Sequence, residues 1–154
     1  MPTPGEMAPE FDLPDGSGKR VRLADLKGKR VILYFYPKDM TPGCTQEACD
    51  FRDLYSEIQA TGVALLGVSP DSSKRHTSFA AKYALPFPLL GDEDAAVATA
   101  YGVWKEKSLY GRKYMGIDRA TFLIDGDGTI HGIWRKVKVP GHAQQVLEAA
   151  SELA

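Results

Sequence analysis

The chain has 154 residues, of which 44% are hydrophobic and 25% are charged, and this composition is typical of one globular domain with a sizeable core. A formal net charge of −1 gives no reason to propose nucleic acid or an acidic membrane as partner, so we expect neither. The two cysteines lie only five positions apart, a placement that favours a reversible redox pair in a reducing compartment over the structural disulfides of a secreted domain.

The beginning of the sequence shows no targeting signal, because no basic stretch is followed by an apolar run. No stretch approaches the length that a membrane-spanning helix needs. We also find no internal repeat, low-complexity tract or linker. The expectation is a cytoplasmic protein, with a single domain over 1–154 and a monomeric state.

The first element in chain order is a small β-hairpin over 8–26. Apolar and polar residues alternate on both arms, and the segment 14–18 between them is rich in the Pro, Gly and Asp of turns. The Gly-Ser-Gly-Lys sequence in that segment lacks the spacing of a phosphate-binding loop. A turn is therefore the favoured interpretation.

The next stretch holds both cysteines. An apolar run over 31–36 predicts a buried strand, which Pro37 ends because it has no backbone donor. Thr41 is the expected N-cap of the following helix, with Pro42 at the first helical position. Cys44 then falls at the third helical position, where the helix dipole, free amides and a nearby hydroxyl favour a thiolate over a thiol.

The predicted helix places the two cysteines differently. Its apolar face consists of Cys44, Ala48, Phe51, Tyr55 and Ile58. Cys44 therefore points toward the core. Cys49 lies five positions on, so the two Cα atoms are roughly 8–9 Å apart on an intact helix. A disulfide needs Cα atoms within about 7 Å, so the first turns of the helix must unwind before the two sulfurs can bond.

The rest of the sequence alternates strands and helices. The expected elements are a strand over 63–69, a helix from Asp71 or Ser72 to about Ala84, a short segment over 87–90, an Ala-rich helix ending near Tyr101, a loop or irregular hairpin over 103–115, strands over 120–124 and 130–134, and a helix from about His142. Such alternation implies a parallel strand pair with a right-handed crossover. The predicted fold class is α/β, a mixed sheet with helices on both faces.

Two acidic clusters suggest metal sites, and both have simpler explanations. Asp92-Glu93-Asp94 precede a predicted helix, where carboxylates favour the helix dipole. The segment 125–129 begins like a calcium loop but lacks the later ligands, and Asp-Gly between two strands is a strong hairpin signal. We expect no metal. His76 falls on a helix face, which favours a packing role over a catalytic one.

The motif Pro37-x-x-x-Thr41-x-x-Cys44 resembles the active-site motif of peroxiredoxins, and 41–49 resembles the bacterioferritin comigratory protein, or peroxiredoxin Q, branch of that family. The resemblance continues in order and spacing through 5–13, 28–36, 63–69 and 116–125. It implies a thioredoxin-like fold and a thiol-dependent peroxidase that needs no cofactor.

By this resemblance Cys44 attacks hydrogen peroxide or an organic hydroperoxide and becomes a sulfenic acid. Cys49 then resolves it as an intramolecular disulfide, which thioredoxin or glutaredoxin reduces. Arg119 matches the arginine that family members place beside the thiolate. The expected catalytic residues are Cys44, Cys49, Thr41 and Arg119, and the expected substrate-binding residues are Pro37, Pro42 and Gly43.

Other chemistries fit the cysteines less well. A phosphatase loop needs an arginine six residues after Cys44, where Asp50 stands. A zinc site would need histidines at paired spacings, and the three histidines are isolated. A cysteine hydrolase would need a base histidine brought near by the fold.

Two further functions remain open: a general thiol–disulfide oxidoreductase and a redox-responsive binding or chaperone module. The Cys-x4-Cys spacing argues against the oxidoreductase, because redox motifs of the thioredoxin type place two residues between the cysteines. The rate of oxidation by hydroperoxide, compared with that by a protein disulfide, separates these functions from a peroxidase.

Overall fold

The structure, a computed structural model, describes residues 2–153. Its strands are β1 (Asp12–Pro14), β2 (Arg20–Arg22), β3 (Val31–Phe35), β4 (Ala64–Ser69), β5 (Leu89–Gly91), β6 (Trp104–Leu109), β7 (Arg112–Ile117), β8 (Ala120–Ile124) and β9 (Ile130–Arg135). Its helices are the 3-10 helix η1 (Leu23–Leu26), α1 (Pro42–Asp53), α2 (Tyr55–Ala60), α3 (Ser73–Tyr83), α4 (Ala96–Ala100) and α5 (His142–Glu152).

A five-stranded sheet forms the centre, in the order β5-β4-β3-β8-β9. The middle strand β3 pairs in parallel with β4 and antiparallel with β8, so the sheet is mixed as predicted. All five residues of β3 are buried, which explains why its sequence is apolar without alternation. The carboxyl end of β3 opens into the loop that leads to α1.

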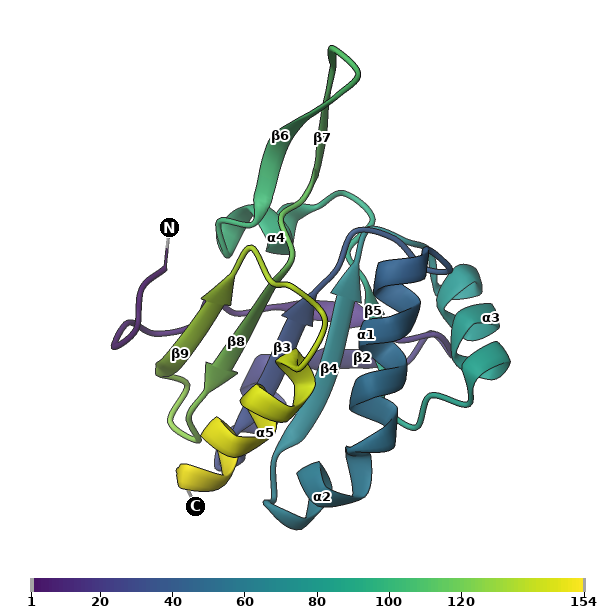
Figure 1. The fold of residues 1–154 in the computed structure, drawn as a ribbon. Coiled ribbons are helices and arrows are strands. Elements are labelled where there is room, and N and C mark those ends of the chain that lie inside the picture. The colour runs from purple at the N-terminus through teal and green to yellow at the C-terminus, as the bar shows by residue number, and fades with distance from the viewer. Residues whose placement is uncertain (1, 154) are drawn as a thin grey trace.

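The two faces of the sheet carry different layers (Figure 1). The face that holds Ile32 and Tyr34 is covered by α1, α2, α3 and α5. The opposite face holds Leu33 and Phe35 and is covered by the N-terminal hairpin, η1 and α4. Helices therefore lie on both faces, with all the longer ones on the side of α1.

Three elements differ from the expectation. The helix that begins at Pro42 is interrupted at Leu54, whose φ and ψ of −100° and 4° separate α1 from α2. Leu23 belongs to η1 and not to the second hairpin arm. The segment expected as a loop or irregular hairpin is a regular antiparallel pair, β6 and β7, which projects from the body (Figure 1). Its two turn residues, Tyr110 and Gly111, both have positive φ, a geometry that matches the twist of the flanking strands.

Two of the local signals at helix starts are confirmed. Ser72 caps α3, because its Oγ accepts from the N–H of Arg75 at 3.2 Å. The carboxylate of Asp92 accepts from two N–H groups of α4, which accounts for the first acidic cluster without a metal. Within residues 2–153 there is no cluster of three or more metal-ligating side chains, and no helix is long and apolar enough to cross a membrane.

Candidate active site

The loop between β3 and α1 sets up the start of the helix. Thr41 is the N-cap and Pro42 is the first helical residue, as predicted. The Thr41 hydroxyl, however, does not cap the helix and donates instead to the carbonyl of Lys38 at 2.8 Å. Met40, between them, has a φ of 70°, in the left-handed region. The loop is thus closed by its own hydrogen bond, and the first amides of α1 have no side-chain cap.

Cys44 points inward from this helix start and is only 1% exposed. Arg119 reaches it from the residue before β8, because the pairing of Ala120 with Phe35 brings that strand end beside the loop. One guanidinium N–H of Arg119 donates to the Cys44 sulfur at 3.2 Å. A Cβ at Gly43 would lie 3.4 Å from the same nitrogen, so Gly43 borders the guanidinium of Arg119.

Glu47 completes the group and was not assigned a role from the sequence. It lies one helical turn after Cys44, is 1% exposed, and accepts from the second guanidinium nitrogen of Arg119 at 2.5 Å. Its other carboxyl oxygen is buried and has no hydrogen-bond partner among the described residues. An acidic residue on an otherwise apolar helix face was the available signal for this position.

The charges of this group act on one another. Burial raises the pKa of Glu47 to about 7, although the Arg119 cation opposes that rise. Burial lowers the pKa of Arg119, but the negative charges of Glu47 and Cys44 outweigh it and the net shift is upward. A guanidinium held against sulfur in this way stabilises a thiolate.

Three further side chains border the site. Burial, followed by the charges of Glu47 and Cys44, raises the pKa of Tyr34, whose hydroxyl is buried without a partner in the part of the chain described. Burial and then Arg119 lower the pKa of His142 to about 4, so this histidine is neutral near pH 7. Burial lowers the pKa of Lys107 on the β6–β7 hairpin, and the nearby charges of Asp118 and Cys44 oppose that shift.

Cys49 lies apart from this group. It is half-buried, it is a free thiol like Cys44, and both cysteines lie in the unbroken helix α1. On such a helix their Cα atoms are roughly 8–9 Å apart, beyond the reach of a disulfide. The structure is therefore that of the reduced protein, and the first turns of α1 must change for the two sulfurs to meet.

The structure thus brings together three of the seven residues that the sequence singled out, namely Cys44, Gly43 and Arg119. Thr41 and Pro42 shape the helix start, and Pro37 follows the end of β3, as expected. No histidine among residues 2–153 forms a hydrogen bond with Cys44, which leaves a cysteine hydrolase without its base.

Comparison with known proteins decides the family. A family model described as the AhpC/TSA family matches residues 4–133. The chain belongs to the AhpC/TSA family. A bcp-type peroxiredoxin relative from Coxiella burnetii is 56% identical over 143 residues, which cover 93% of this chain and 95% of the relative. Peroxiredoxin Bcp of Bacillus subtilis is 48% identical over 150 residues, covering 97% and 96%.

Within the AhpC/TSA family the chain is a peroxiredoxin of the bacterioferritin comigratory protein, or peroxiredoxin Q, branch. A solved structure of the Xanthomonas campestris bacterioferritin comigratory protein superposes with a TM-score of 0.89 at 44% identity, over 93% of this chain and 91% of that one. The expected thioredoxin-like fold with an N-terminal hairpin is confirmed. This peroxiredoxin is an enzyme, a thiol-dependent peroxidase that acts on peroxides and is restored by a reductant of the thioredoxin type.

Proposed function

We propose that Cys44 is the peroxidatic residue of this peroxidase. The observation that carries the proposal is the Arg119 guanidinium, 3.2 Å from a sulfur that is almost fully buried at a helix start. A cation and a helix N-terminus together stabilise the thiolate, which is the nucleophilic form of cysteine. The absence of a capping side chain at Thr41 leaves the first amides of α1 free to meet a substrate oxygen.

The reaction begins with attack of the Cys44 thiolate on the terminal oxygen of the hydroperoxide. The S–O bond forms as the O–O bond breaks, and the departing oxygen takes up a proton and leaves as water or an alcohol. Arg119 and the amides of Gly43 and Cys44 are placed to stabilise the charge that grows on that oxygen. The Thr41 hydroxyl, whose hydrogen is bound to Lys38, can still accept a hydrogen bond from the substrate.

Pro37, Pro42 and Gly43 form the proposed substrate pocket. Pro42 has a fixed φ and no N–H, so the helix start keeps its shape when substrate enters. Gly43 borders the Arg119 guanidinium that contacts the sulfur. We assign hydrogen peroxide and organic hydroperoxides as substrates, since the Xanthomonas relative is described as having alkyl peroxide reduction activity.

Cys49 is the proposed resolving residue. After oxidation, its thiolate attacks the Cys44 sulfenic acid, an S–S bond forms and water leaves. Thioredoxin is the proposed reductant of this intramolecular disulfide, with glutaredoxin as the alternative. A catalytic cycle of this kind uses only thiol chemistry and requires no metal or organic cofactor.

The remaining assignments concern the whole molecule. We assign a single peroxiredoxin domain over 1–154, a monomer, and a cytoplasmic location with neither nucleic acid nor membrane as partner. The near-zero net charge and the cysteine content support these assignments. A reducing compartment would keep both thiols ready for the next peroxide.

Stopped-flow oxidation of the reduced protein tests the proposed function. The parent should react quickly with hydroperoxide and slowly with a protein disulfide, and Cys44→Ser should abolish the fast reaction. Cys49→Ser should keep the fast first step but lose thioredoxin-dependent turnover measured through NADPH. Fast reaction with a protein disulfide would favour a general oxidoreductase. Slow reaction with both the hydroperoxide and the protein disulfide would favour a binding module.

Mass spectrometry after one equivalent of peroxide identifies the reacting residues. The parent should show a Cys44–Cys49 disulfide within one chain, and Cys49→Ser should show an oxygen adduct on Cys44. A disulfide between two chains, or undiminished turnover of Cys49→Ser with thioredoxin, would contradict the resolving role of Cys49.

A further inference from the structure

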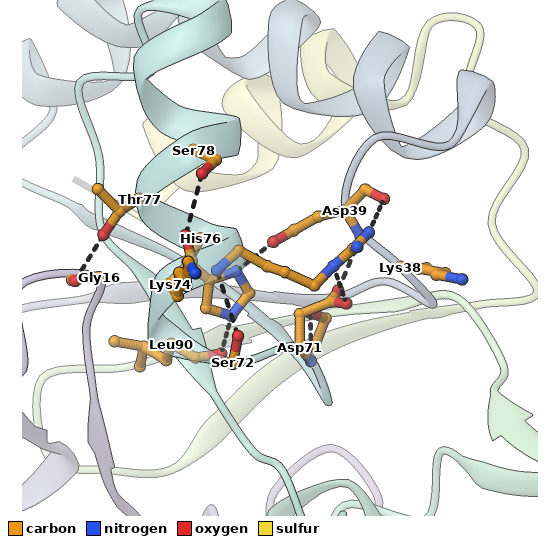
Figure 2. Close-up of polar contacts among 12 residues, drawn as sticks. Gly16, Lys38, Asp39, Asp71, Ser72, Lys74, His76, Thr77, Ser78 and Leu90 are labelled. Atoms are coloured by element: carbon orange, nitrogen blue, oxygen red, sulfur yellow. Dashed lines mark hydrogen bonds and ion pairs between the residues drawn. The ribbon is translucent and has the colours of Figure 1, made fainter.

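The loop before Cys44 contains a buried carboxylate, Asp39, that no step of the proposed reaction uses. Asp39 is only 1% exposed. One carboxyl oxygen lies 2.7 Å from Nδ1 of His76 on α3, and the other accepts from the Tyr36 hydroxyl at 2.5 Å. Figure 2 shows Asp39 and His76 facing each other between the loop and the helix.

The backbone of Asp39 is held as well. Its N–H donates to a carboxyl oxygen of Asp71 at 2.7 Å, and its carbonyl accepts from the Arg75 guanidinium at 3.0 Å. Arg75 and Asp71 are themselves joined at 2.9 Å. All polar groups of Asp39 are therefore bonded, and every partner except Tyr36 lies in the first turns of α3 or just before it (Figure 2).

The hydrogen bonds of His76 determine the net charge of the Asp39–His76 pair. Nε2 of His76 lies 3.0 Å from the carbonyl of Leu90, which can only accept, so Nε2 carries a hydrogen. The contact between Nδ1 and Asp39 then needs one more proton, on either the ring or the carboxyl group. In both cases the pair is neutral overall and every one of its bonds is made, so its burial leaves no uncompensated charge.

This arrangement excludes a direct chemical role for His76. Both ring nitrogens are occupied, and the side chain has no exposed surface. A general acid or base must reach the substrate with a free or exchangeable position. What the histidine can do is hold Asp39 in place.

The chain between Asp39 and Cys44 has little freedom to absorb a displacement. Met40 is in the left-handed region, which a residue of its type rarely adopts. Thr41 is tied back to Lys38, and the φ of Pro42 is fixed by its ring. A movement of Asp39 is therefore transmitted to the start of α1, and with it to the sulfur.

We propose that the Asp39–His76 pair, with its clamp on the Asp39 backbone, positions Cys44 against Arg119. The two partners of the thiol contact arrive on different elements, Cys44 on α1 and Arg119 before β8. Their 3.2 Å contact therefore requires that the loop be fixed to the rest of the molecule, and α3 supplies that anchor. Asp39 and His76 are positioning residues, and this inference rests on the proposed role of Cys44.

The main test is His76→Phe, which keeps an aromatic ring on α3 but leaves one Asp39 oxygen without its partner. The second-order rate constant for oxidation by hydrogen peroxide should fall by about tenfold or more, because alignment of reacting groups is sensitive to displacements of about 1 Å. Alkylation of Cys44 by iodoacetamide also depends on the thiolate that Arg119 stabilises, but it involves no departing peroxide oxygen for Arg119 to meet. That rate should fall by less than about threefold, so the ratio of the two rates reports position.

Two matched variants separate the position of Cys44 from the charge of Asp39 and from a general loss of stability. Asp39→Asn can keep every bond, because its amide group can donate to Nδ1 of a neutral His76 and accept from Tyr36. Its peroxide rate should stay within about threefold of the parent, as a purely geometric role requires. Val146→Ala opens a cavity under α5, in the same core cluster as Cys44 but outside the hydrogen bonds of Asp39, and should lower the melting temperature while leaving the rate ratio unchanged.

The outcomes distinguish this inference from the proposed function. A folded His76→Phe with a parental rate ratio would overturn the positioning role, and so would an equal change of ratio in Val146→Ala. A large loss in Asp39→Asn would assign the role to the shared proton and not to geometry. Oxidation of a residue other than Cys44 in the parent would instead overturn the proposed function.

Arg75→Met keeps the inference testable if His76→Phe does not fold. The Arg75 side chain is 46% exposed, so its replacement disturbs the core little, yet it removes the donor to the Asp39 carbonyl. The ratio of peroxide to alkylation rates should fall by about threefold. A parental ratio in folded Arg75→Met would overturn the role of the clamp.

Discussion

Two pairs, each of one acidic and one basic side chain, flank the start of α1, and they differ in how many of their hydrogen-bonding groups have partners. In the Asp39–His76 pair, both carboxyl oxygens and both ring nitrogens have partners. In the Arg119–Glu47 pair, one carboxyl oxygen has no partner within residues 2–153, and one guanidinium nitrogen is bonded to a reactive sulfur. The Asp39–His76 pair has no free group and can only hold the loop before α1 in place. The Arg119–Glu47 pair has groups that can still bond to a substrate or change their bonds during a reaction.

Formation of the Cys44–Cys49 disulfide should produce the largest difference between the surroundings of the two pairs. Because the first turns of α1 must unwind for the disulfide, amide exchange over 45–53 should become about a thousandfold faster or more, as when a helix segment opens fully. The amide of His76, which is bonded to the Ser72 carbonyl inside α3, should keep its protection. Exchange measured by mass spectrometry on the reduced and disulfide forms makes the comparison. Unchanged protection over 45–53 would contradict the distance argument.

Removal of Arg119 should give the next largest effect. Arg119→Ala deletes the donor to the sulfur and the partner of Glu47 together. Peroxide oxidation should slow by about a hundredfold, or about 2.7 kcal/mol of transition-state stabilisation. Stopped-flow kinetics provide the measurement, with exposed Arg112 replaced by Ala as the control. A rate within twofold of the parent would reassign Arg119 to structure.

Glu47→Gln tests how much stability the protein loses when the buried Glu47 carboxyl group becomes charged. The folded-state pKa of about 7 lies above the ordinary value of 4.5, so between these values the folded protein keeps a proton that the unfolded chain releases. The associated stability is fully present below about pH 4.5 and is lost as the pH rises through about 7.

Denaturant unfolding at pH 5 and pH 7.5 measures this difference. The parent should lose about 2–3 kcal/mol more between these pH values than Glu47→Gln. Exposed Glu57→Gln on α2 is the matched control and should follow the parent. The same pH dependence in Glu47→Gln and the parent would show that Glu47 does not titrate in this range.

His142 should have the smallest effect on the pH dependence of stability, and this effect should be opposite in sign to that of Glu47. Its folded-state pKa of about 4 lies below the ordinary 6.5, so the stability it contributes is present above about pH 6.5 and is lost as the pH falls through about 4. His142→Asn should remove about 1–2 kcal/mol of acid sensitivity, allowing for solvent screening. Unfolding at pH 4 and pH 7 tests this, with exposed His131→Asn as the control. An unaltered acid response in His142→Asn would refute it.

The sequence by itself determined the elements and the reactive stretch. The β3 strand, the helix start at Thr41 and Pro42, the inward direction of Cys44 and the Ser72 cap all depend on residues within a few positions of one another. Such signals are local because helix periodicity, capping and proline geometry act over one or two turns. The motif around Cys44 also indicated the family and hence the fold.

Only the tertiary structure decided which distant side chains meet. Arg119 and Cys44 are 75 residues apart and meet because β8 lies beside β3, whereas Asp39 and His76 are 37 residues apart and meet because α3 packs on the loop. The burial of Glu47 follows from the same packing and contradicts its ordinary surface preference. Strand order and helix packing depend on the whole core, and no local pattern encodes them.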